Sequence, residues 1–287
     1  MVKKNKVFSK IALFSSKVDG RTIKIANQVK EILENLGILV FISTSLESKE
    51  FKKKDLISDR KILQTADLLV AIGGDGTLLS SARKFGSKGL PVLGINLGNL
   101  GFLTDIPPEN LTSSLLEVLE GNFTTDERFF LTASINEDDT NQIALNEIVV
   151  HSKSVAQLLE YEITIDEEFV YRQKADGIII SSPTGSTAYS MSGSGSIIHP
   201  SVNSIHLLPM FPHSLTARPL LINDNSVVKI KLFKRSGASV SFDSHNKLNL
   251  KNNDVVTIKK AKSTLSLIHP LNHNFYSACR TKLGWSL

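Results

Sequence analysis

The sequence predicts an α/β N-terminal domain with a doubly wound parallel sheet, followed by a mainly antiparallel β domain, α+β overall. Up to Gly121, apolar runs of strand length alternate with segments of helical periodicity, which is typical of βαβ units. After Gly121, short strand-like runs separated by turn residues predominate, and this pattern indicates antiparallel sheet. A length of 287 residues fits two domains.

The N-terminal half predicts four strands, three helices and one partly helical segment. Apolar residues at helical spacing between Ile23 and Leu33 predict a helix, and Gly37 supplies its end. Pro107 and Pro108 start the last helix, which Gly121 ends. The expected strands span residues 7–15, 38–43, 66–72 and 91–95, and the expected helices span 21–36, 77–85 and 107–119. The partly helical segment is 51–63, and 96–105 is a glycine-rich loop.

The second half predicts nine strands and one short helical stretch at 186–192. The strands are expected at 129–135, 143–151, 159–165, 169–173, 178–182, 227–233, 238–242, 255–259 and 265–269. We expect a first domain at 1–125, a β-rich domain at 126–274, and a C-terminal segment at 275–287 that returns to the first domain.

Composition narrows the functional classes. The net charge of +5 favours anionic partners, but the basic residues are dispersed and do not alternate with aromatic ones, which argues against nucleic acid. Phosphorylated small molecules fit the charge equally well. No apolar run reaches the ~20 residues of a membrane helix. Cys279 is the only cysteine, which excludes a disulfide framework and favours a cytoplasmic protein.

The most informative stretch is the apolar strand at 66–72 and the turn Gly73-Gly74-Asp75-Gly76-Thr77 that follows it. A strand, a glycine turn and a helix in succession are typical of phosphate sites. A carboxylate beside a bound phosphate is electrostatically unfavourable. Its presence therefore indicates that Asp75 either holds a metal ion or takes a proton from an attacking hydroxyl. The alternative is an ordinary turn with an aspartate N-cap. The Walker A motif does not fit, because no Gly-Lys-Ser/Thr ending follows. The dinucleotide fingerprint does not fit either, because Leu79 stands at its third glycine position.

Two further stretches carry polar groups beside apolar strands. Asn146 and Glu147 fall within the apolar pattern at 143–150 and suit the vicinal hydroxyls of a ribose; a solvent-facing pair is the alternative. Asp176-Gly177 and a hydroxyl-rich turn flank the strand at 178–182. That turn predicts a second phosphate or sugar contact, or else ordinary loop material; its hydroxyl residues are Ser181, Ser182, Thr184, Ser186 and Thr187. The seven histidines show no metal-ligand spacing, and we interpret His199, His206 and His213 as structural.

These motifs, in this order, resemble the NAD kinase family. The resemblance runs from the first strand to the tail Thr281-Lys282-Leu283-Gly284-Trp285 and so covers nearly the whole chain. The stretches at 209–215 and 218–220 resemble the bacterial branch. The Gly-Gly-Asp-Gly turn is shared with other kinases, whereas Asn146-Glu147 and the block at 183–189 single out this family. Two further stretches of the sequence carry the resemblance to this family, residues 94–96 and 98–103.

The resemblance implies ATP-dependent phosphorylation of the 2′-hydroxyl of the adenosine ribose of NAD, which gives NADP. It implies that Asp75 is the catalytic base and that a divalent cation, Mg²⁺, accompanies ATP, with no metal ligands assigned in the chain. It also implies a homo-oligomer, a dimer or tetramer, with NAD and ATP as its small-molecule partners and no nucleic acid or membrane. The residues implied to bind phosphate are Gly73, Gly74, Gly76 and Thr77. Those implied to bind NAD are Asp75, Gly76, Phe102, Asn146, Glu147, Gln157, Lys174, Asp176, Thr187, Ala188, Tyr189, Ser190, Met191, Ser192 and His245.

Three of these positions depart from the family pattern. Lys174 replaces the usual Arg, Gln157 replaces His, and His245 replaces Gln. Lysine keeps the charge of arginine but loses its bidentate geometry.

Two rival functions remain. A lipid or sugar kinase would share the glycine turn without needing Asn146-Glu147. A non-catalytic dinucleotide sensor would keep Asn146, Glu147 and Asp176 but would not need Asp75, and the intact glycine turn speaks against it.

Overall fold

The computed structural model describes residues 6–51, 53–98, 101–104, 106–154, 157–233 and 237–285. Its contacts divide the chain into an α/β unit, residues 1–127 and 263–287, and a β unit, residues 128–262. The expected boundary at 125 lies close to this division. Residues 263–274, which we assigned to the β domain, group instead with the α/β unit, because the end of one long strand pairs with the parallel sheet there.

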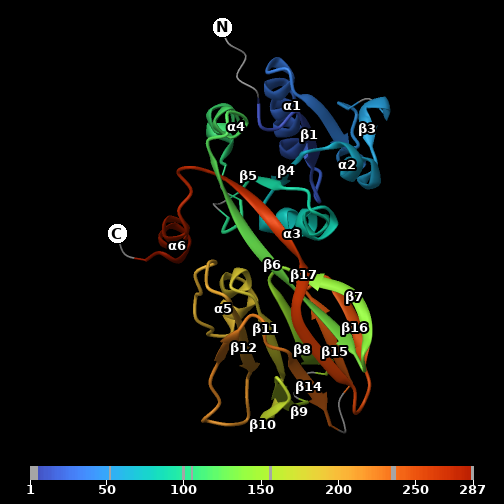
Figure 1. Cartoon of the computed structure of the whole chain (residues 1–287), viewed down its shortest axis with the longest axis vertical. Helices are drawn as coiled ribbons and strands as arrows, with labels where there is room; N and C mark the ends of the chain where they lie inside the picture. Colours follow the sequence, from blue (N-terminus) through green and yellow to red (C-terminus); the bar gives the residue numbers. More distant parts are fainter. Residues whose placement is uncertain are drawn as a thin grey trace. The chain divides into compact units, whose positions relative to one another are not determined.

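The sheet of the α/β unit has the order β3-β2-β1-β4-β5-β17, and neighbouring strands are parallel (Figure 1). The chain fills one side of β1 with β2 and β3 and then crosses to β4 and β5. Ligands of doubly wound sheets bind where the strand order reverses in this way, at the carboxyl ends of the strands. The strands are β1 (Lys10–Phe14), β2 (Leu39–Ser43), β3 (Leu56–Ile57), β4 (Leu68–Gly73), β5 (Val92–Asn96) and the end of β17 (Val255–Pro270).

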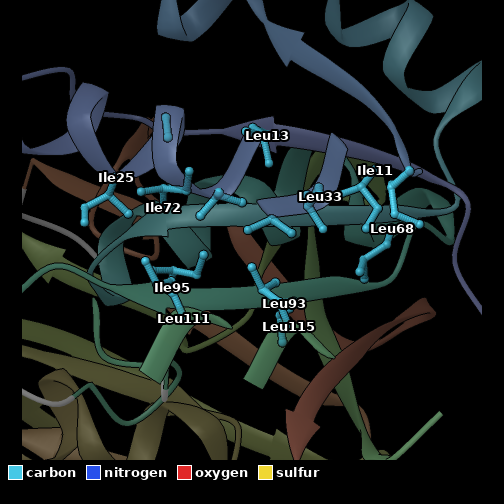
Figure 2. Close-up of a cluster of buried hydrophobic side chains, with 14 of the residues drawn as sticks. Ile11, Leu13, Ile25, Leu33, Leu68, Ile72, Leu93, Ile95, Leu111 and Leu115 are labelled. Atoms are coloured by element: carbon cyan, nitrogen blue, oxygen red, sulfur yellow. The ribbon is translucent and has the colours of Figure 1, made fainter. Parts of the chain in front are cut away.

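Helices cover both faces of this sheet. Helices α1 and α4 share one core with the alternate strand residues Leu13, Ile72 and Leu93 (Figure 2). Helix α3 lies on the other face, where Phe85 just beyond its end meets Phe14 edge-on with ring centroids 5.3 Å apart. The α-helices are α1 (Gly20–Asn35), α2 (Asp59–Thr65), α3 (Asp75–Lys84), α4 (Leu111–Leu119) and α6 (Phe275–Leu283), and the 3₁₀ turns are Thr44–Leu46, Lys53–Asp55, Gly86–Lys88 and Pro108–Asn110.

The β unit packs antiparallel strands in two layers around a common apolar core. One layer has the order β13-β12-β11-β8-β15-β16, and the other contains β10-β9-β14 with the first part of β17 and the β6–β7 pair. The strands are β6 (Phe123–Ile135), β7 (Asp138–Ala144), β8 (Glu147–Ser152), β9 (Leu159–Ile165), β10 (Glu168–Ala175), β11 (Gly177–Ser181), β12 (Ser204–Met210), β13 (Leu220–Asn223), β14 (Val228–Leu232), β15 (Ala238–Phe242) and β16 (Asn246–Leu250), with a 3₁₀ turn at Thr184–Thr187 and the one-turn α5 at Tyr189–Ser192. The predicted fold class is confirmed.

Several predicted elements were wrong in detail. The single strand expected at 143–151 is two strands, β7 and β8, separated at Leu145 and Asn146. The strands expected at 255–259 and 265–269 are one continuous strand, β17. Its polar middle is held partly by Lys260, which pairs with Asp224 at 2.6 Å. Strands β3, β12, β13 and β16 were not predicted.

No helix among the described residues is both long and apolar enough to cross a membrane.

Candidate functional site

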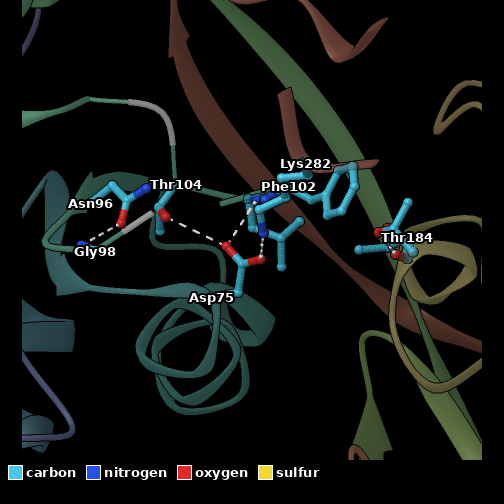
Figure 3. Close-up of polar contacts among 9 residues, drawn as sticks. Asp75, Asn96, Gly98, Phe102, Thr104, Thr184 and Lys282 are labelled. Carbon is cyan, nitrogen blue, oxygen red and sulfur yellow. Dashed lines mark hydrogen bonds and ion pairs between the residues drawn. The ribbon is translucent and has the colours of Figure 1, made fainter. Parts of the chain in front are cut away.

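Asp75 is the first residue of α3, and Gly74 occupies the N-cap position. The Asp75 carboxylate is held by a loop distant in sequence (Figure 3). Its Oδ2 accepts the amide of Phe102 at 3.0 Å, and its Oδ1 accepts the amide of Leu103 at 3.2 Å and the hydroxyl of Thr104 at 3.4 Å. The side chain remains 32% exposed. The N-cap alternative was therefore wrong: the carboxylate is fixed in place at the carboxyl end of β4 and still reaches solvent.

Glycines allow two close approaches around Asp75. A Cβ on Gly101 would overlap the Asp75 carboxyl group and the Thr104 hydroxyl, and a Cβ on Gly73 would overlap the Thr77 side chain. By contrast, a Cβ on Gly74 or Gly76 would meet no protein atom within 4 Å. The first pair of glycines is therefore required by packing, whereas the second pair leaves open space beside the backbone. Residues 99, 100 and 105 of the predicted loop lie outside the described residues.

A hydroxyl pair lies where the strand order reverses. The Ser16 and Thr77 hydroxyl oxygens are 2.8 Å apart, and these residues follow the neighbouring strands β1 and β4. Sequence reasoning selected Thr77 but missed Ser16. The signal was a hydroxyl residue directly after the first apolar strand of a doubly wound sheet.

In the β unit, one buried carboxylate shapes the turn at Asn146 and Glu147. Asp243 is 3% exposed, and its carboxylate accepts the amides of Leu145, Asn146 and Glu147 at 3.0, 2.8 and 3.3 Å. Because these amides donate to Asp243, they are not available for hydrogen bonds between strands, and this explains the break between β7 and β8. Asp243 was not selected from the sequence, because nothing local links it to a residue 97 positions away.

The turn presents two buried acceptors without partners. Among the described residues, Oδ1 of Asn146 and Oε2 of Glu147 make no hydrogen bond, although the residues are only 7% and 3% exposed. Leaving a buried polar group unsatisfied costs about 1–3 kcal/mol. Two such atoms on adjacent residues mark a place where a ligand can supply donors.

Burial raises the pKa of the Glu147 carboxyl to about 8, and the charge of Asp243 adds to this, while a hydrogen bond from the Tyr189 amide opposes it. Because the pKa in the folded state exceeds the ordinary 4.5, folding takes up a proton between these values. The stability contributed by this group is complete below pH 4.5 and is lost as the pH rises through 8.

We therefore expect Glu147→Gln to become progressively more stable than the parent protein as the pH rises from 5 to 8, with no further gain above. Denaturant unfolding of both proteins at each pH measures this difference. A difference that stays constant across this range would contradict the raised pKa.

The Asp243 contacts predict a large effect on stability. An asparagine at this position offers one acceptor oxygen and turns an NH₂ group toward backbone donors, so Asp243→Asn is expected to lower the free energy of unfolding by about 2–3 kcal/mol. The control is Asp138→Asn on β7, where the parent side chain is exposed. Equal effects of the two substitutions in urea unfolding would show that Asp243 does not organise the turn.

The hydroxyl-rich turn uses hydroxyls within the protein. Four of its five hydroxyl residues are buried, and their hydroxyls bond within the protein: that of Ser182 donates to the Leu145 carbonyl, and that of Ser186 donates to the Pro183 carbonyl. A Cβ on Gly185 would overlap the Asn146 carbonyl. The hydroxyl-rich turn therefore packs against the Asn146–Glu147 turn and stabilises it, through Ser182 and Gly185.

The structure separates the remaining predicted NAD-binding residues into groups. Asp176 and Tyr189 line one cavity of about 470 Å³, while Lys174 lines another of about 460 Å³. His245 follows Asp243 in the turn between β15 and β16 and contacts the Asp243 carbonyl through Nδ1 at 2.7 Å. Gln157 is exposed ahead of β9.

The segment at 187–192 lies beside the Glu147 carboxyl, which the Tyr189 amide faces. Within it, Ser190 is fully buried, and its hydroxyl lies 3.4 Å from Nδ1 of His206 on β12. Ser190 is thus placed for packing, whereas Tyr189 is 42% exposed. The amide of Phe102 donates a hydrogen bond to Asp75, and its ring packs against Phe275 of α6.

Two family models match the chain. Residues 11–123 match the ATP-NAD kinase N-terminal domain, and residues 145–270 match the ATP-NAD kinase C-terminal domain. Together these ranges include the glycine turn with Asp75 and the Asn146–Glu147 turn.

Curated relatives and solved structures agree. The NAD kinases of Teredinibacter turnerae and Pseudomonas entomophila are 43% and 46% identical over 231 and 234 residues, which is 79% of each chain compared. A crystal structure of yeast NADH kinase complexed with NADH has a TM-score of 0.87 at 27% identity, covering 97% of this chain and 88% of that one. An Archaeoglobus fulgidus NAD kinase in complex with ATP has a TM-score of 0.73 at 25% identity, covering 96% and 97%. The resemblance seen in the motifs is confirmed: this chain belongs to the NAD kinase family.

Proposed function

We propose that this NAD kinase transfers the γ-phosphoryl group of ATP to the 2′-hydroxyl of the adenosine ribose of NAD. The observation that carries the proposal is the Asp75 carboxylate, which two backbone amides fix while it stays one-third exposed. It lies next to Gly76, whose backbone faces open space. Phosphoryl transfer requires mainly positioning and charge stabilisation, together with a residue that orients the nucleophile.

Asp75 acts as the base in this reaction. Its carboxylate accepts a hydrogen bond from the ribose 2′-hydroxyl and takes the proton as the oxygen attacks. The bond from that oxygen to the γ-phosphorus forms, the bond from the γ-phosphorus to the bridging oxygen breaks, and ADP leaves. The amides of Phe102 and Leu103 keep the carboxylate in one orientation, which limits the reorganisation needed during transfer.

The donor phosphates bind at the start of α3. A helix leaves the amides of its first turn without intrahelical partners, and its dipole favours an anion there. The open space beside Gly74 and Gly76 allows phosphate oxygens to approach the backbone. In the hydrogen-bonded pair of Thr77 and Ser16 one hydroxyl donates to the other, which leaves one further donor for the phosphates. Gly73 belongs to the same turn.

The dinucleotide binds to the β unit. The adenosine 2′-hydroxyl donates to Asp75, and other ribose hydroxyls of NAD donate to Oδ1 of Asn146 and Oε2 of Glu147, the two buried acceptors without partners. We keep the other implied contacts as part of the proposal; they are Asp75, Gly76, Phe102, Gln157, Lys174, Asp176, residues 187–192 and His245.

The divalent cation enters with ATP as part of the substrate. Among the described residues, no three His, Cys, Asp or Glu side chains are grouped so as to hold a metal ion. Magnesium commonly keeps few protein ligands and binds largely through the phosphates of its nucleotide. The Asp75 oxygens already accept hydrogen bonds from two amides and a hydroxyl. This environment suits a base better than a metal ligand.

We also propose that the protein forms a homo-oligomer through its β unit. Large apolar side chains are strongly exposed on β10 and between β12 and β13, with Phe169 at 66%, Phe211 at 80% and Leu215 at 96%. Large apolar side chains as exposed as these are candidates for burial against a second copy of the chain. The cytoplasmic location rests on the single cysteine and stays a prediction.

The test is incubation of the purified protein with ATP, MgCl₂ and NAD, with NADP detected by a dehydrogenase that accepts only NADP. We expect NADP to form only when both substrates are present. Phosphorylation of a lipid or sugar in place of NAD would favour the rival kinase. Binding of NAD with no product would favour the dinucleotide sensor.

A further inference from the structure

The C-terminal helix α6 places a cation against the proposed base. Helix α6 starts at an N-cap, Asn274, whose side chain accepts the Ser277 amide at 2.9 Å, and it buries Ala278 and Cys279. From its last turn, Lys282 extends to Asp75, and its Nζ lies 3.5 Å from Oδ2 (Figure 3). These two residues are 207 positions apart in the chain and belong to the same α/β unit.

The contact is built from more than one interaction. The ammonium group of Lys282 lies 4.6 Å from the centroid of the Phe102 ring, and the Phe102 ring packs on Phe275 of α6 at 6.5 Å between centroids. The amide of Phe102 in turn donates to the same Asp75 oxygen that faces Lys282. The loop and the helix therefore hold the carboxylate and the cation next to each other.

Stability does not explain this pair. The two side chains are 27% and 32% exposed, and ion pairs this accessible to solvent contribute at most about 1 kcal/mol. A cation beside a base has a more specific consequence during phosphoryl transfer. Once the Asp75 carboxylate takes the proton it becomes neutral, and the ammonium loses its counter-charge at the moment when the transferring group carries negative charge on its equatorial oxygens.

We propose that Lys282 is a catalytic residue of the phosphoryl transfer: its ammonium, held by Asp75 before reaction, stabilises the equatorial oxygens of the γ-phosphoryl group. The inference rests on the proposed function and adds a donor from the C-terminal helix to it. The lysine stem is long and flexible and its ammonium is compact, so the charge can shift from the carboxylate to the phosphoryl group without movement of α6. No proton leaves Lys282 in this step.

The test compares Lys282→Met with Arg280→Met, which removes an exposed cation from the same turn of α6. We expect Lys282→Met to lower kcat by about 10²- to 10³-fold, the range seen when one charge-stabilising group is removed. The KM for NAD should change by less than threefold, and Arg280→Met should behave as the parent protein. Lys282→Arg, which restores the charge, should recover part of the loss.

A binding measurement distinguishes charge stabilisation from support of the fold. Affinity for ADP with aluminium fluoride, in the presence of NAD and Mg²⁺, should fall in Lys282→Met by the same factor as kcat, while affinity for ATP alone stays within threefold. An unchanged or raised kcat would overturn the proposal, and a raised kcat would identify the pair as an inhibitory contact. An equal loss of ATP affinity, or a matching loss in Arg280→Met, would overturn it as well. The proposed function is tested independently of Lys282, because it is contradicted if the parent protein makes no NADP.

Discussion

Replacement of Asp75 by asparagine is expected to lower kcat by about 10²–10⁴-fold, the contribution of a positioned base. An amide cannot accept the hydroxyl proton at neutral pH, and its NH₂ group would face the amides of Phe102 and Leu103 that now donate to the carboxylate. The NAD affinity should stay within a few-fold, because the ribose acceptors Asn146 and Glu147 are unchanged.

Steady-state kinetics and titration calorimetry with NAD measure the two effects separately. The matched control is Asp59→Asn, which removes a carboxylate from α2 that pairs with Lys84 at 3.2 Å on the surface. Near-normal turnover of Asp75→Asn would exclude Asp75 as the base. Loss of NAD binding together with activity would indicate that Asp75 mainly supports the substrate.

The second large effect is expected at the dinucleotide contacts. Asn146→Ala removes one of the two buried acceptors without a protein partner, and the ribose hydroxyl that bonds to it would be left unpaired. The cost of about 1–3 kcal/mol corresponds to a loss of NAD affinity between about 5- and 150-fold. The affinity for ATP should change little, since the proposed donor site lies at the start of α3.

Fluorescence or calorimetric titration with each nucleotide tests this selectivity. Asn249→Ala on β16 is the control, because that side chain is exposed and outside the proposed site. Equal losses of NAD and ATP affinity in Asn146→Ala would contradict the ribose assignment.

Local patterns predicted much of the fold. The helical spacing of apolar residues in α1 and the apolar run of β4 correspond to one buried face and one buried strand. The glycine turn was found for the same reason, since Gly73 and Thr77 meet within a single strand–helix connection. Features fixed by neighbours in the sequence are therefore readable from it.

Contacts across the chain could not be predicted. Asp243 is 97 positions from Asn146, and the break between β7 and β8 depends on it, so an apolar pattern at 143–151 was interpreted as one strand. The return of the segment at 275–287 to the first domain was expected, but not the contact of Lys282 with Asp75. The contact of Ser16 with Thr77 likewise depends on the sheet order. The composition of the hydroxyl-rich turn could not show which of its hydroxyls bond within the protein, as those of Ser182 and Ser186 do.

The most direct measurement is the ³¹P NMR spectrum of the products formed from ATP and NAD. If the carboxylate of Asp75 activates the adenosine 2′-hydroxyl, the spectrum will show one new phosphomonoester at that position, in equal amount to ADP, and NAD lacking this hydroxyl will give none. A phosphate on another hydroxyl, or ATP consumed without any phosphorylated dinucleotide, would contradict the mechanism.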